Sequence, residues 1–252
     1  MFAVERQKKI LELLNLQGSV AVNELGRQLD VTVETIRRDL EKLEQLEQVT
    51  RTHGGAVLYE ESALDLSSEK RSVMNREGKI EIAKKAILHI QPGDTVFLDG
   101  STTSCYLAKL VKELKNITVI TNSLDILNEL SGCDKIKLIS TGGALDINNK
   151  SFVGEISINN IRDSYCAAKV FFSSKGVIHE KGILESSEAE YRIKRAMIEN
   201  SQQKYFLADK SKIGRIGFIK LANFSDIDFF VSDKEPDNEL KSILKKNKVK
   251  IL

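Results

Sequence analysis

The chain has 252 residues, of which 41% are hydrophobic and 29% are charged, and its formal net charge is +2. This composition is typical of a globular protein of one or two domains, and no apolar run approaches the roughly 20 residues that a membrane-spanning helix needs. Three widely spaced cysteines, Cys105, Cys133 and Cys166, form no CxxC pair, which argues against a zinc ribbon or a disulfide framework. We therefore expect a cytoplasmic protein with no metal, no cofactor and no membrane contact.

Apolar residues at helical spacing predict three helices near the start of the chain. The first covers about residues 4–16 and ends at Gln17-Gly18, and the second covers about 22–29. The third follows a three-residue connection and places Val33, Ile36, Leu40 and Leu43 on one face. Thr32 stands where the N-cap of this third helix belongs.

The stretch QVTRTHGGAVL, residues 48–58, predicts two short strands around Gly54-Gly55, which is a hairpin signal. Helix, helix, short turn, helix and hairpin is the order of a winged helix-turn-helix. We expect this DNA-binding domain to cover residues 1–58. These residues carry eight Lys and Arg against nine Asp and Glu, so any affinity for DNA depends on where the charges lie.

Residues 59–76 are polar with weak periodicity and are expected to form a linker. From residue 77 to 252, short apolar runs such as TVFLD, ITVIT, KIKLIS, AKVFFS and KYFLA alternate with amphipathic helical stretches. This alternation predicts an α/β domain with a mostly parallel sheet covered on both faces. The fold class expected is thus an N-terminal winged helix-turn-helix followed by a C-terminal α/β domain.

The outward face of the third helix admits two interpretations. With its apolar residues buried, the face is an ordinary solvated surface on which Arg38 pairs with Glu34 or Glu41. In a helix-turn-helix, however, the second helix of the motif enters the major groove, where Thr35 and Arg38 would meet base edges and Arg37 a phosphate. The residues expected at the DNA are Thr32, Glu34, Thr35, Arg37, Arg38, Lys42, Arg51 and His53.

Polar loops follow several of the expected strands. FLDGSTTS, residues 97–104, follows one strand and opens a helix, so its N–H groups favour an anion, while Asp99 could accept sugar hydroxyls. Ser101 could instead simply cap the helix. Because ligands of open α/β sheets gather beyond the carboxyl ends of the strands, we expect these loops to share one site. The residues expected there are Asp99, Gly100, Ser101, Thr102, Thr103, Asn122, Ser123, Gly142, Gly143, Lys175 and Lys212.

The N-terminal pattern resembles the signature of DeoR-family transcriptional regulators. Arg6, Ile10 and Leu14 are followed after seventeen residues by Thr32 and then by TIRRDL, residues 35–40. RTHGGAV, residues 51–57, resembles the wing of the same family. Members often carry a Gly-Leu or Gly-Val step after the recognition helix, where this chain has Glu47-Gln48, so we expect the helix end or the angle of the wing to differ.

The rest of the chain, from about residue 71, resembles the sensor domain of the same family. LDGSTT, TNS, TGG, EAEYRIKRAMI and ADKSKIG occur in the expected order. The resemblance implies a repressor of a carbohydrate operon that binds double-stranded operator DNA as a homodimer or homotetramer. It also implies that a phosphorylated sugar binds in a domain related to ribose-5-phosphate isomerase.

Two other functions were weighed. A sugar-phosphate isomerase with an added DNA-binding domain is the main alternative, but the acidic run that such enzymes carry corresponds here to Ser173-Ser174-Lys175-Gly176, which has no carboxylate. We therefore expect no catalysis. A metal sensor is not expected, because His53, His89 and His179 lie far apart. Ser187 and Glu190 have the spacing of a helix capping box, and Glu188 could face the effector.

Overall fold

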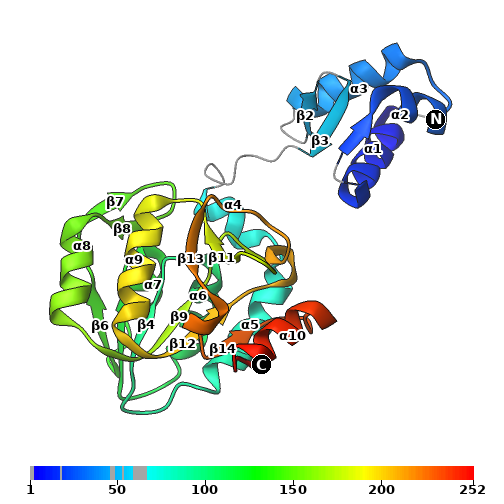
Figure 1. Ribbon diagram of the computed structural model, residues 1–252. Helices are drawn as coiled ribbons and strands as arrows, with labels where there is room; N and C mark the ends of the chain where they lie inside the picture. Colours follow the sequence, from blue (N-terminus) through cyan, green and yellow to red (C-terminus); the bar gives the residue numbers. More distant parts are fainter. Residues whose placement is uncertain (1–2, 18, 46–48, 53, 59–66) are drawn as a thin grey trace. The chain divides into compact units, whose positions relative to one another are not determined.

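The computed structural model describes residues 3–17, 19–45, 49–52, 54–58 and 67–252. The chain forms two compact units, an N-terminal unit Met1–Asp65 and a C-terminal unit Leu66–Leu252 (Figure 1). Two features of interest, His53 and the Glu47-Gln48 step, lie outside the described residues. Within the described ranges no helix is long and apolar enough to cross a membrane.

The N-terminal unit has the expected order of helices and hairpin. A short strand that the sequence did not indicate, β1, joins the hairpin to give an antiparallel sheet of order β1-β3-β2. The elements are α1 (Ala3–Gln17), β1 (Ser19–Ala21), α2 (Val22–Gln28), α3 (Val33–Gln45), β2 (Val49–Thr52) and β3 (Gly55–Leu58). The winged helix-turn-helix prediction is confirmed.

Apolar residues spaced three and four apart give this unit its core. Ile10 and Leu14 of α1 are fully buried together with Ile36 and Leu40 of α3. The turn between α2 and α3 is tight, because Asp30 adopts a left-handed conformation with φ of 51°. The outward face of α3 is therefore fixed by packing on its other side.

The C-terminal unit is built on a seven-stranded sheet in which all neighbouring strands are parallel, as predicted. Its order is β15-β14-β12-β9-β4-β5-β6. The strands are β4 (Thr95–Leu98), β5 (Ile117–Thr121), β6 (Ile136–Ser140), β9 (Ala167–Phe172), β12 (Ser201–Leu207), β14 (Phe229–Val231) and β15 (Lys250–Ile251). Strands β12, β9, β4, β5 and β6 are adjacent, so their carboxyl ends lie along one edge.

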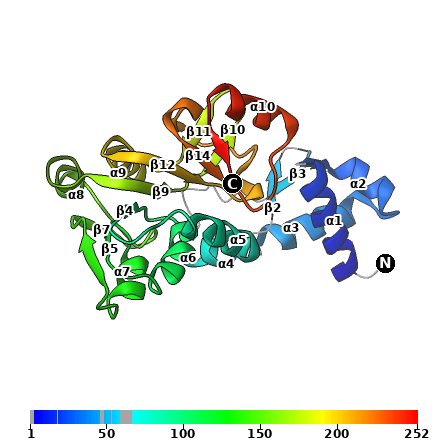
Figure 2. The ribbon, with the colours of Figure 1, turned by 90° about the horizontal axis from the view of Figure 1, so that it is seen from below.

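Helices cover both faces of this sheet, and each face has its own apolar core (Figure 2). One face carries α5 (Arg76–Ile87), α6 (Thr102–Val111) and α7 (Leu124–Leu130). The other carries α8 (Glu155–Asn159), α9 (Glu188–Glu199) and α10 (Asn238–Lys246). A strand buried on both faces reads as a continuous apolar run, which is why TVFL and AKVFF were recognisable.

Several short elements of this unit were not expected. They are the hairpin β7 (Ala144–Asp146) and β8 (Ser151–Val153), and the antiparallel sheet of β10 (Gly176–Ile178), β11 (Gly182–Glu185) and β13 (Ile219–Ala222). The π-helical turn Asn160–Ser164 and the 3-10 turns Lys210–Lys212 and Phe224–Asp226 complete the fold. Strands of three or four residues are too short to show a clear alternation.

The second half of the expected linker is structured. Helix α4 (Ser68–Val73) begins at an N-cap on Ser67, and the Ser72 carbonyl accepts a 3.1 Å hydrogen bond from the Tyr106 hydroxyl of α6. Residues 67–76 therefore belong to the C-terminal unit and do not extend the linker. A helix of six residues gives almost no periodicity in the sequence.

Candidate functional site

The start of α3 is held by a threonine cap. Thr32 Oγ1 accepts a hydrogen bond from the Thr35 backbone N–H at 3.2 Å, and the two hydroxyls lie 2.8 Å apart. The N-cap expected at Thr32 is thus confirmed. The same contact fixes the side chain of Thr35, one of the residues expected at the DNA.

The expected reading face of α3 is open to solvent. Glu34, Arg37, Arg38 and Lys42 are all exposed, and 78% of the Arg38 side chain is accessible. Glu34 lies 3.9 Å from Arg37 and 3.8 Å from Arg38, so the pairing that a solvated face would show is present. Exposed pairs of this kind contribute little, at most about 1 kcal/mol, and both arginines can exchange Glu34 for another anion.

The wing brings one more cation to the same side of the unit. The backbone N–H of Arg51 donates to Glu44 Oε1 at 3.1 Å, and its guanidinium lies 3.6 Å from Glu41. These contacts join strand β2 to the last turns of α3. Arg27 of α2 was not among the expected residues; it lines a surface hollow of about 600 Å³ together with Thr32.

Beneath this face, a buried ion pair fastens α1 to α3. The Arg6 guanidinium donates to both carboxylate oxygens of Asp39, and Gln7 Nε2 donates to Asp39 Oδ1 at 3.1 Å. Arg6 is 8% exposed and Asp39 is 4% exposed. The hydrogen bond to Asp39 raises the pKa of Arg6. Of the TIRRDL run, the aspartate is therefore structural while its arginines point outward.

The expected effector residues lie where strands β4, β5, β6, β9 and β12 end, and we call these five loops the strand-end site. Asp99 to Thr103, Asn122 and Ser123 are buried. Gly142, Gly143, Lys175 and Lys212 are partly exposed. The parallel order of the sheet places the five loops side by side.

Asp99 organises the first of these loops. Its Oδ1 accepts from the Ser101 N–H at 3.3 Å, from the Ser101 hydroxyl at 2.6 Å and from the Ser104 hydroxyl at 2.5 Å. Its Oδ2 accepts from the Ser173 N–H of the neighbouring loop at 3.0 Å. Asp99 is fully buried, so this geometry supports a loop-shaping role for Asp99 in place of the sugar contact expected from the sequence.

Ser101 is the N-cap of α6, and its hydroxyl accepts a hydrogen bond from the Ser104 N–H at 3.2 Å. The interpretation of Ser101 as a helix cap is thus confirmed. The cap leaves the first N–H groups of α6, at Thr102 and Thr103, without acceptors inside the helix. Such a helix start attracts anions. The two interpretations of this loop are therefore compatible, because the cap positions the N–H groups that would face an anion.

Asn122 carries an open acceptor at the end of β5. Its Nδ2 donates to the Phe152 carbonyl at 3.2 Å, but its Oδ1 has no hydrogen-bond partner within the described part of the chain, although the residue is fully buried. Buried polar atoms are nearly always paired, so a ligand hydroxyl would satisfy this oxygen. A Cβ at Gly100 would lie 3.4 Å from Asn122 Nδ2, and the glycine thus keeps this corner open.

The two glycines after β6 have a backbone role. Gly142 and Gly143 have φ values of 66° and 110°, a conformation that side chains rarely tolerate. A Cβ at Gly143 would come within 2.6 Å of the Val153 carbonyl of β8. Gly143 therefore lets the chain pass close to Val153 of β8, and the positive φ of both glycines explains them without a ligand contact.

Buried charges beneath the loops were missed by the sequence analysis. Lys194 of α9, 5% exposed, donates to Glu185 Oε2 at 2.6 Å and lies 3.6 Å from Asp99 Oδ2. Burial opposes its charge, but Glu185, Asp99 and Glu190 raise the pKa of Lys194. Glu190 accepts from the Ser151 hydroxyl, and burial raises the pKa of Glu190.

The capping box expected at the start of α9 is half formed. Ser187 Oγ accepts from the Glu190 N–H at 3.3 Å, while the Glu190 carboxylate accepts from Ser151 of β8. Glu188 is exposed. Glu190 therefore belongs to the group of buried charges around Lys194, and its carboxylate helps to position the β7–β8 hairpin through Ser151.

Two lysines near the site, Lys79 and Lys212, have a lowered pKa. Burial lowers the pKa of Lys79 to about 8 and the pKa of Lys212 to about 8, in spite of the opposite effect of Asp209. The positive charge of Arg71 lowers the pKa of both lysines further. Lys79 lies three residues before the buried Ile82 and four before the buried Ala83, so it shares their side of helix α5. A lysine within such an apolar stripe was the sequence signal that could have identified Lys79 as a buried residue.

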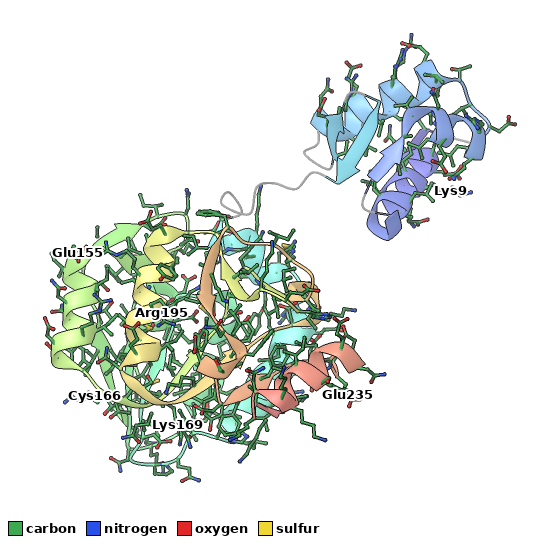
Figure 3. All side chains as sticks on the ribbon, viewed as in Figure 1. Lys9, Glu155, Cys166, Lys169, Arg195 and Glu235 are labelled. Atoms are coloured by element: carbon green, nitrogen blue, oxygen red, sulfur yellow. The ribbon has the colours of Figure 1, made fainter. Side chains whose placement is uncertain are left out.

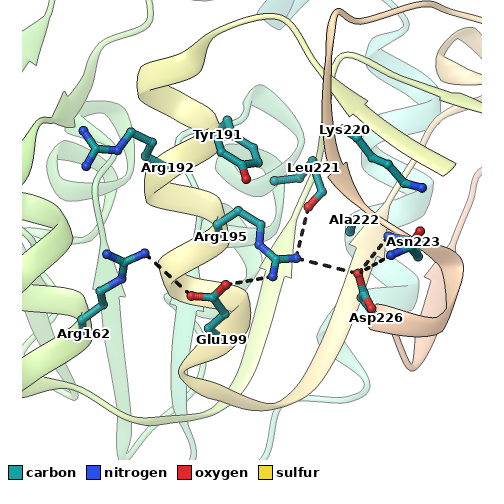
Figure 4. A pocket seen from close by; sticks show the side chains of 10 residues that line it. All are labelled: Arg162, Tyr191, Arg192, Arg195, Glu199, Lys220, Leu221, Ala222, Asn223 and Asp226. Atoms are coloured by element: carbon teal, nitrogen blue, oxygen red, sulfur yellow. Dashed lines mark hydrogen bonds and ion pairs between the residues drawn. The ribbon is translucent and has the colours of Figure 1, made fainter. Parts of the chain in front are cut away.

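A separate hollow of about 530 Å³ lies over α9 and β13 and contains none of the expected effector residues (Figure 4). Two of its arginines pair with carboxylates: Arg195 lies 2.8 Å from Glu199 and 3.7 Å from Asp226, and Arg162 lies 3.8 Å from Glu199. Figure 4 shows these pairs side by side. The hollow is also lined by Arg192, which lies 2.5 Å from Glu155, and by Lys220.

The histidines, cysteines and carboxylates of the described residues are the side chains that could hold a metal ion. The described residues contain no group of three or more His, Cys, Asp and Glu placed to hold a metal ion. All three cysteines are free thiols, with Cys166 exposed on the surface (Figure 3). Cys105 lies 3.8 Å from the Ser123 hydroxyl, and burial raises the pKa of its thiol to about 12.

Comparison with known proteins agrees with both units. Residues 6–62 match the model of the DeoR-like helix-turn-helix domain, and residues 74–234 match the model of the DeoR C terminal sensor domain. The uncharacterized HTH-type transcriptional regulator YulB of Bacillus subtilis is 38% identical over 251 residues, which is 100% of this chain and 96% of that protein.

The L-fucose operon activator of Haemophilus influenzae is 37% identical over 234 residues, covering 92% of this chain and 93% of that protein. Among solved structures, ribose 5-phosphate isomerase A from Methanocaldococcus jannaschii is similar with a TM-score of 0.39 and 15% identity, covering 54% of this chain and 53% of that one. A structural likeness at this level carries no information about activity.

Proposed function

The chain belongs to the DeoR family of DNA-binding transcriptional regulators, and from this premise we propose that it represses a carbohydrate operon until a phosphorylated sugar binds in its C-terminal unit. The strand-end site supports this assignment. It combines a capped helix start, a buried amide oxygen without a partner and two lysines whose charge is destabilised. The buried amide oxygen of Asn122, which has no hydrogen-bond partner among the described residues, is the observation that carries the proposal.

The roles of the DNA-binding residues follow from their positions. Arg38 and Thr35 meet base edges in the major groove, with Arg37, Lys42 and Arg51 at phosphates. Arg27 of α2 is a further phosphate contact, because the first helix of such a motif crosses the backbone. The chain acts as a homodimer or homotetramer on operator DNA in the cytoplasm, with two α3 helices one helical turn of DNA apart, about 34–36 Å.

The effector roles are assigned in the same way. The N–H groups of Thr102 and Thr103, with Lys212 and Lys79, bind the phosphate, and Asn122 Oδ1 accepts from a sugar hydroxyl. Asp99 and Lys194 shape the site from below. Lys175, a partly exposed residue after β9, lies at its border.

The buried carboxylates around the strand-end site fit a protein that binds a sugar phosphate better than one that isomerises it. Isomerisation of a sugar phosphate needs a carboxylate that is free to move a proton. Asp99 accepts four hydrogen bonds within the protein, Glu185 pairs with Lys194, and Glu190 accepts from Ser151. None of these three acids is left open toward a ligand in the way that Asn122 is, so the isomerase alternative is not favoured.

A thermal-shift screen tests the effector proposal directly. The purified full-length chain is heated with triose, pentose and hexose phosphates, with their unphosphorylated counterparts and with inorganic phosphate. We expect one sugar phosphate to raise the melting temperature of the C-terminal unit while its unphosphorylated form does not, because a ligand stabilises only the state that it binds. No shift with any phosphate would contradict the proposed effector class.

Replacement of Arg38 by alanine tests the reading face. A bidentate arginine–guanine contact provides about 1–3 kcal/mol of base discrimination, so we expect operator affinity to fall by that amount while nonspecific DNA affinity changes little. The measurement is a titration of labelled operator and of unrelated DNA. Arg37→Ala is the matched control: it should weaken both DNAs alike, and an Arg38 variant behaving the same way would place Arg38 at a phosphate.

The two lysines predict a pH dependence of anion binding. With a pKa of about 8 in the free protein, Lys79 and Lys212 lose their protons as the pH rises through 8, and the attraction for a phosphate is lost with them. A bound anion favours the protonated form and raises both pKa values, so binding takes up protons. We expect the affinity to fall steadily between pH 7 and about pH 10, as calorimetry in buffers of different ionisation heat would show. A constant affinity over that range would exclude both lysines from the site.

A further inference from the structure

Helix α4 is the first element after residues 59–66, which lead from the DNA-binding unit, and the β7–β8 hairpin holds it at three points. The Ser68 N–H donates to the Asn148 carbonyl at 2.8 Å, and Lys150 Nζ lies 2.7 Å from Glu69 Oε1. The Arg71 guanidinium donates to Asn149 Oδ1 at 2.6 Å. All three contacts are made by residues in the turn between β7 and β8. A movement of this turn would therefore move α4 as well.

Strand β8, which directly follows this turn, lies in the strand-end site. The Phe152 N–H donates to the Asn122 carbonyl at 2.7 Å, and Asn122 Nδ2 donates back to the Phe152 carbonyl. The neighbouring Ser151 donates to buried Glu190, and its Cβ lies only 3.0 Å from where a Cβ of Gly100 would stand. A ligand that engages Asn122 therefore acts on strand β8 directly.

Arg71 connects α4 to the site in a second way. Its carbonyl accepts a hydrogen bond from Lys79, which is buried, and its charge is felt by both Lys79 and Lys212. Arg71 therefore holds a lysine of the site through its carbonyl while its guanidinium is fastened to Asn149. Because charges act on one another through space, an anion that binds in the site attracts the Arg71 guanidinium.

We propose that Arg71 is a coupling residue, which adds positive charge to the strand-end site and, through Asn149, ties the first helix that follows the DNA-binding unit in the sequence to the hairpin that contacts the ligand. This inference rests on the proposed function. Binding of an anion reorients Arg71 and the hairpin together, and α4 changes with them. An effector shifts operator affinity only through such a difference between two states.

Two neighbouring asparagines provide the test. Asn149→Ala removes the hydrogen bond to the Arg71 guanidinium, together with the 2.8 Å bond from Asn149 Nδ2 to Asp146, and keeps the charge of Arg71. Asn148→Ala is the matched control, because Asn148 is exposed and takes part through its backbone, whose N–H donates to Asp146 and whose carbonyl accepts from Ser68. Each full-length variant is titrated with the sugar phosphate that gives the largest thermal shift, and then with operator DNA selected by the wild-type chain. Arg71→Gln, which removes charge and fastening together, is measured in parallel.

In Asn149→Ala we expect ligand affinity within about twofold of wild type but at least a fivefold loss of the ligand's effect on operator affinity. Asn148→Ala should keep both, and Arg71→Gln should lose about tenfold in ligand affinity as well. An Asn149 variant that responds like wild type, or that loses ligand binding altogether, would overturn the coupling role alone. Failure of the wild-type chain to bind any phosphate would instead overturn the proposed function and this inference with it.

Discussion

Replacement of Lys194 by methionine is expected to destabilise the C-terminal unit by about 3–5 kcal/mol. Lys194 lies between two buried carboxylates, 2.6 Å from Glu185 and 3.6 Å from Asp99. Methionine fills similar volume on the helix but leaves both carboxylates without this cation. Urea unfolding followed by far-ultraviolet circular dichroism measures the loss.

An exposed pair of the same length is the control for this variant. Lys241 Nζ lies 2.6 Å from Glu235 Oε1, with 77% of the Glu235 side chain accessible (Figure 3). Lys241→Met should cost less than about 1 kcal/mol, because solvent already screens the pair. Equal losses in the two variants would mean that burial does not determine the contribution of Lys194.

Replacement of Asp39 by alanine is expected to have an effect of similar size in the other unit. It leaves the buried Arg6 guanidinium without its carboxylate, at a cost of about 3–5 kcal/mol, which is a large fraction of the stability of so small a unit. Operator binding should be lost at physiological temperature, whereas the thermal shift of the C-terminal unit with its effector should persist.

Glu24→Ala is the matched control for Asp39. Glu24 is an exposed acid in the first turn of α2, and it accepts a hydrogen bond from Gln28 at 3.3 Å, so its loss should cost at most about 1 kcal/mol. Normal operator affinity in Asp39→Ala would show that the Arg6–Asp39 pair is dispensable, and that α1 and α3 are held by their apolar core alone.

The sequence predicted those parts of the fold that have a long or unbroken apolar pattern. TVFL between Pro92-Gly93 and Asp99-Gly100 could be read as a buried strand, and the apolar stripe of α3 as a helix. Strand β7, with three largely exposed residues, gives no such signal. Helix α10 was missed although Asp237 caps it and Leu240 and Leu244 repeat at helical spacing, so its signal was present in the sequence.

The candidate site was predicted in outline only. Small and polar residues after strands indicated the five loops, because the carboxyl ends of parallel strands must meet. Lys194 and Glu190 could not be assigned in the same way, since a charged residue on a helix is exposed unless a partner is buried with it, and for Lys79 the apolar stripe was the sole signal. Their partners lie on β11, on β8 and in α4, which are elements too short to be recognised in the sequence.

The central claim is that one phosphorylated sugar, bound in the strand-end site, changes the affinity of the DNA-binding unit for its operator. The most direct measurement is a titration of operator DNA with the full-length chain, with and without each sugar phosphate and its unphosphorylated counterpart. We predict that one phosphorylated sugar weakens operator binding by about 5- to 150-fold and that its unphosphorylated form does not. An operator affinity that no phosphorylated sugar changes, or that both forms change equally, would contradict the account.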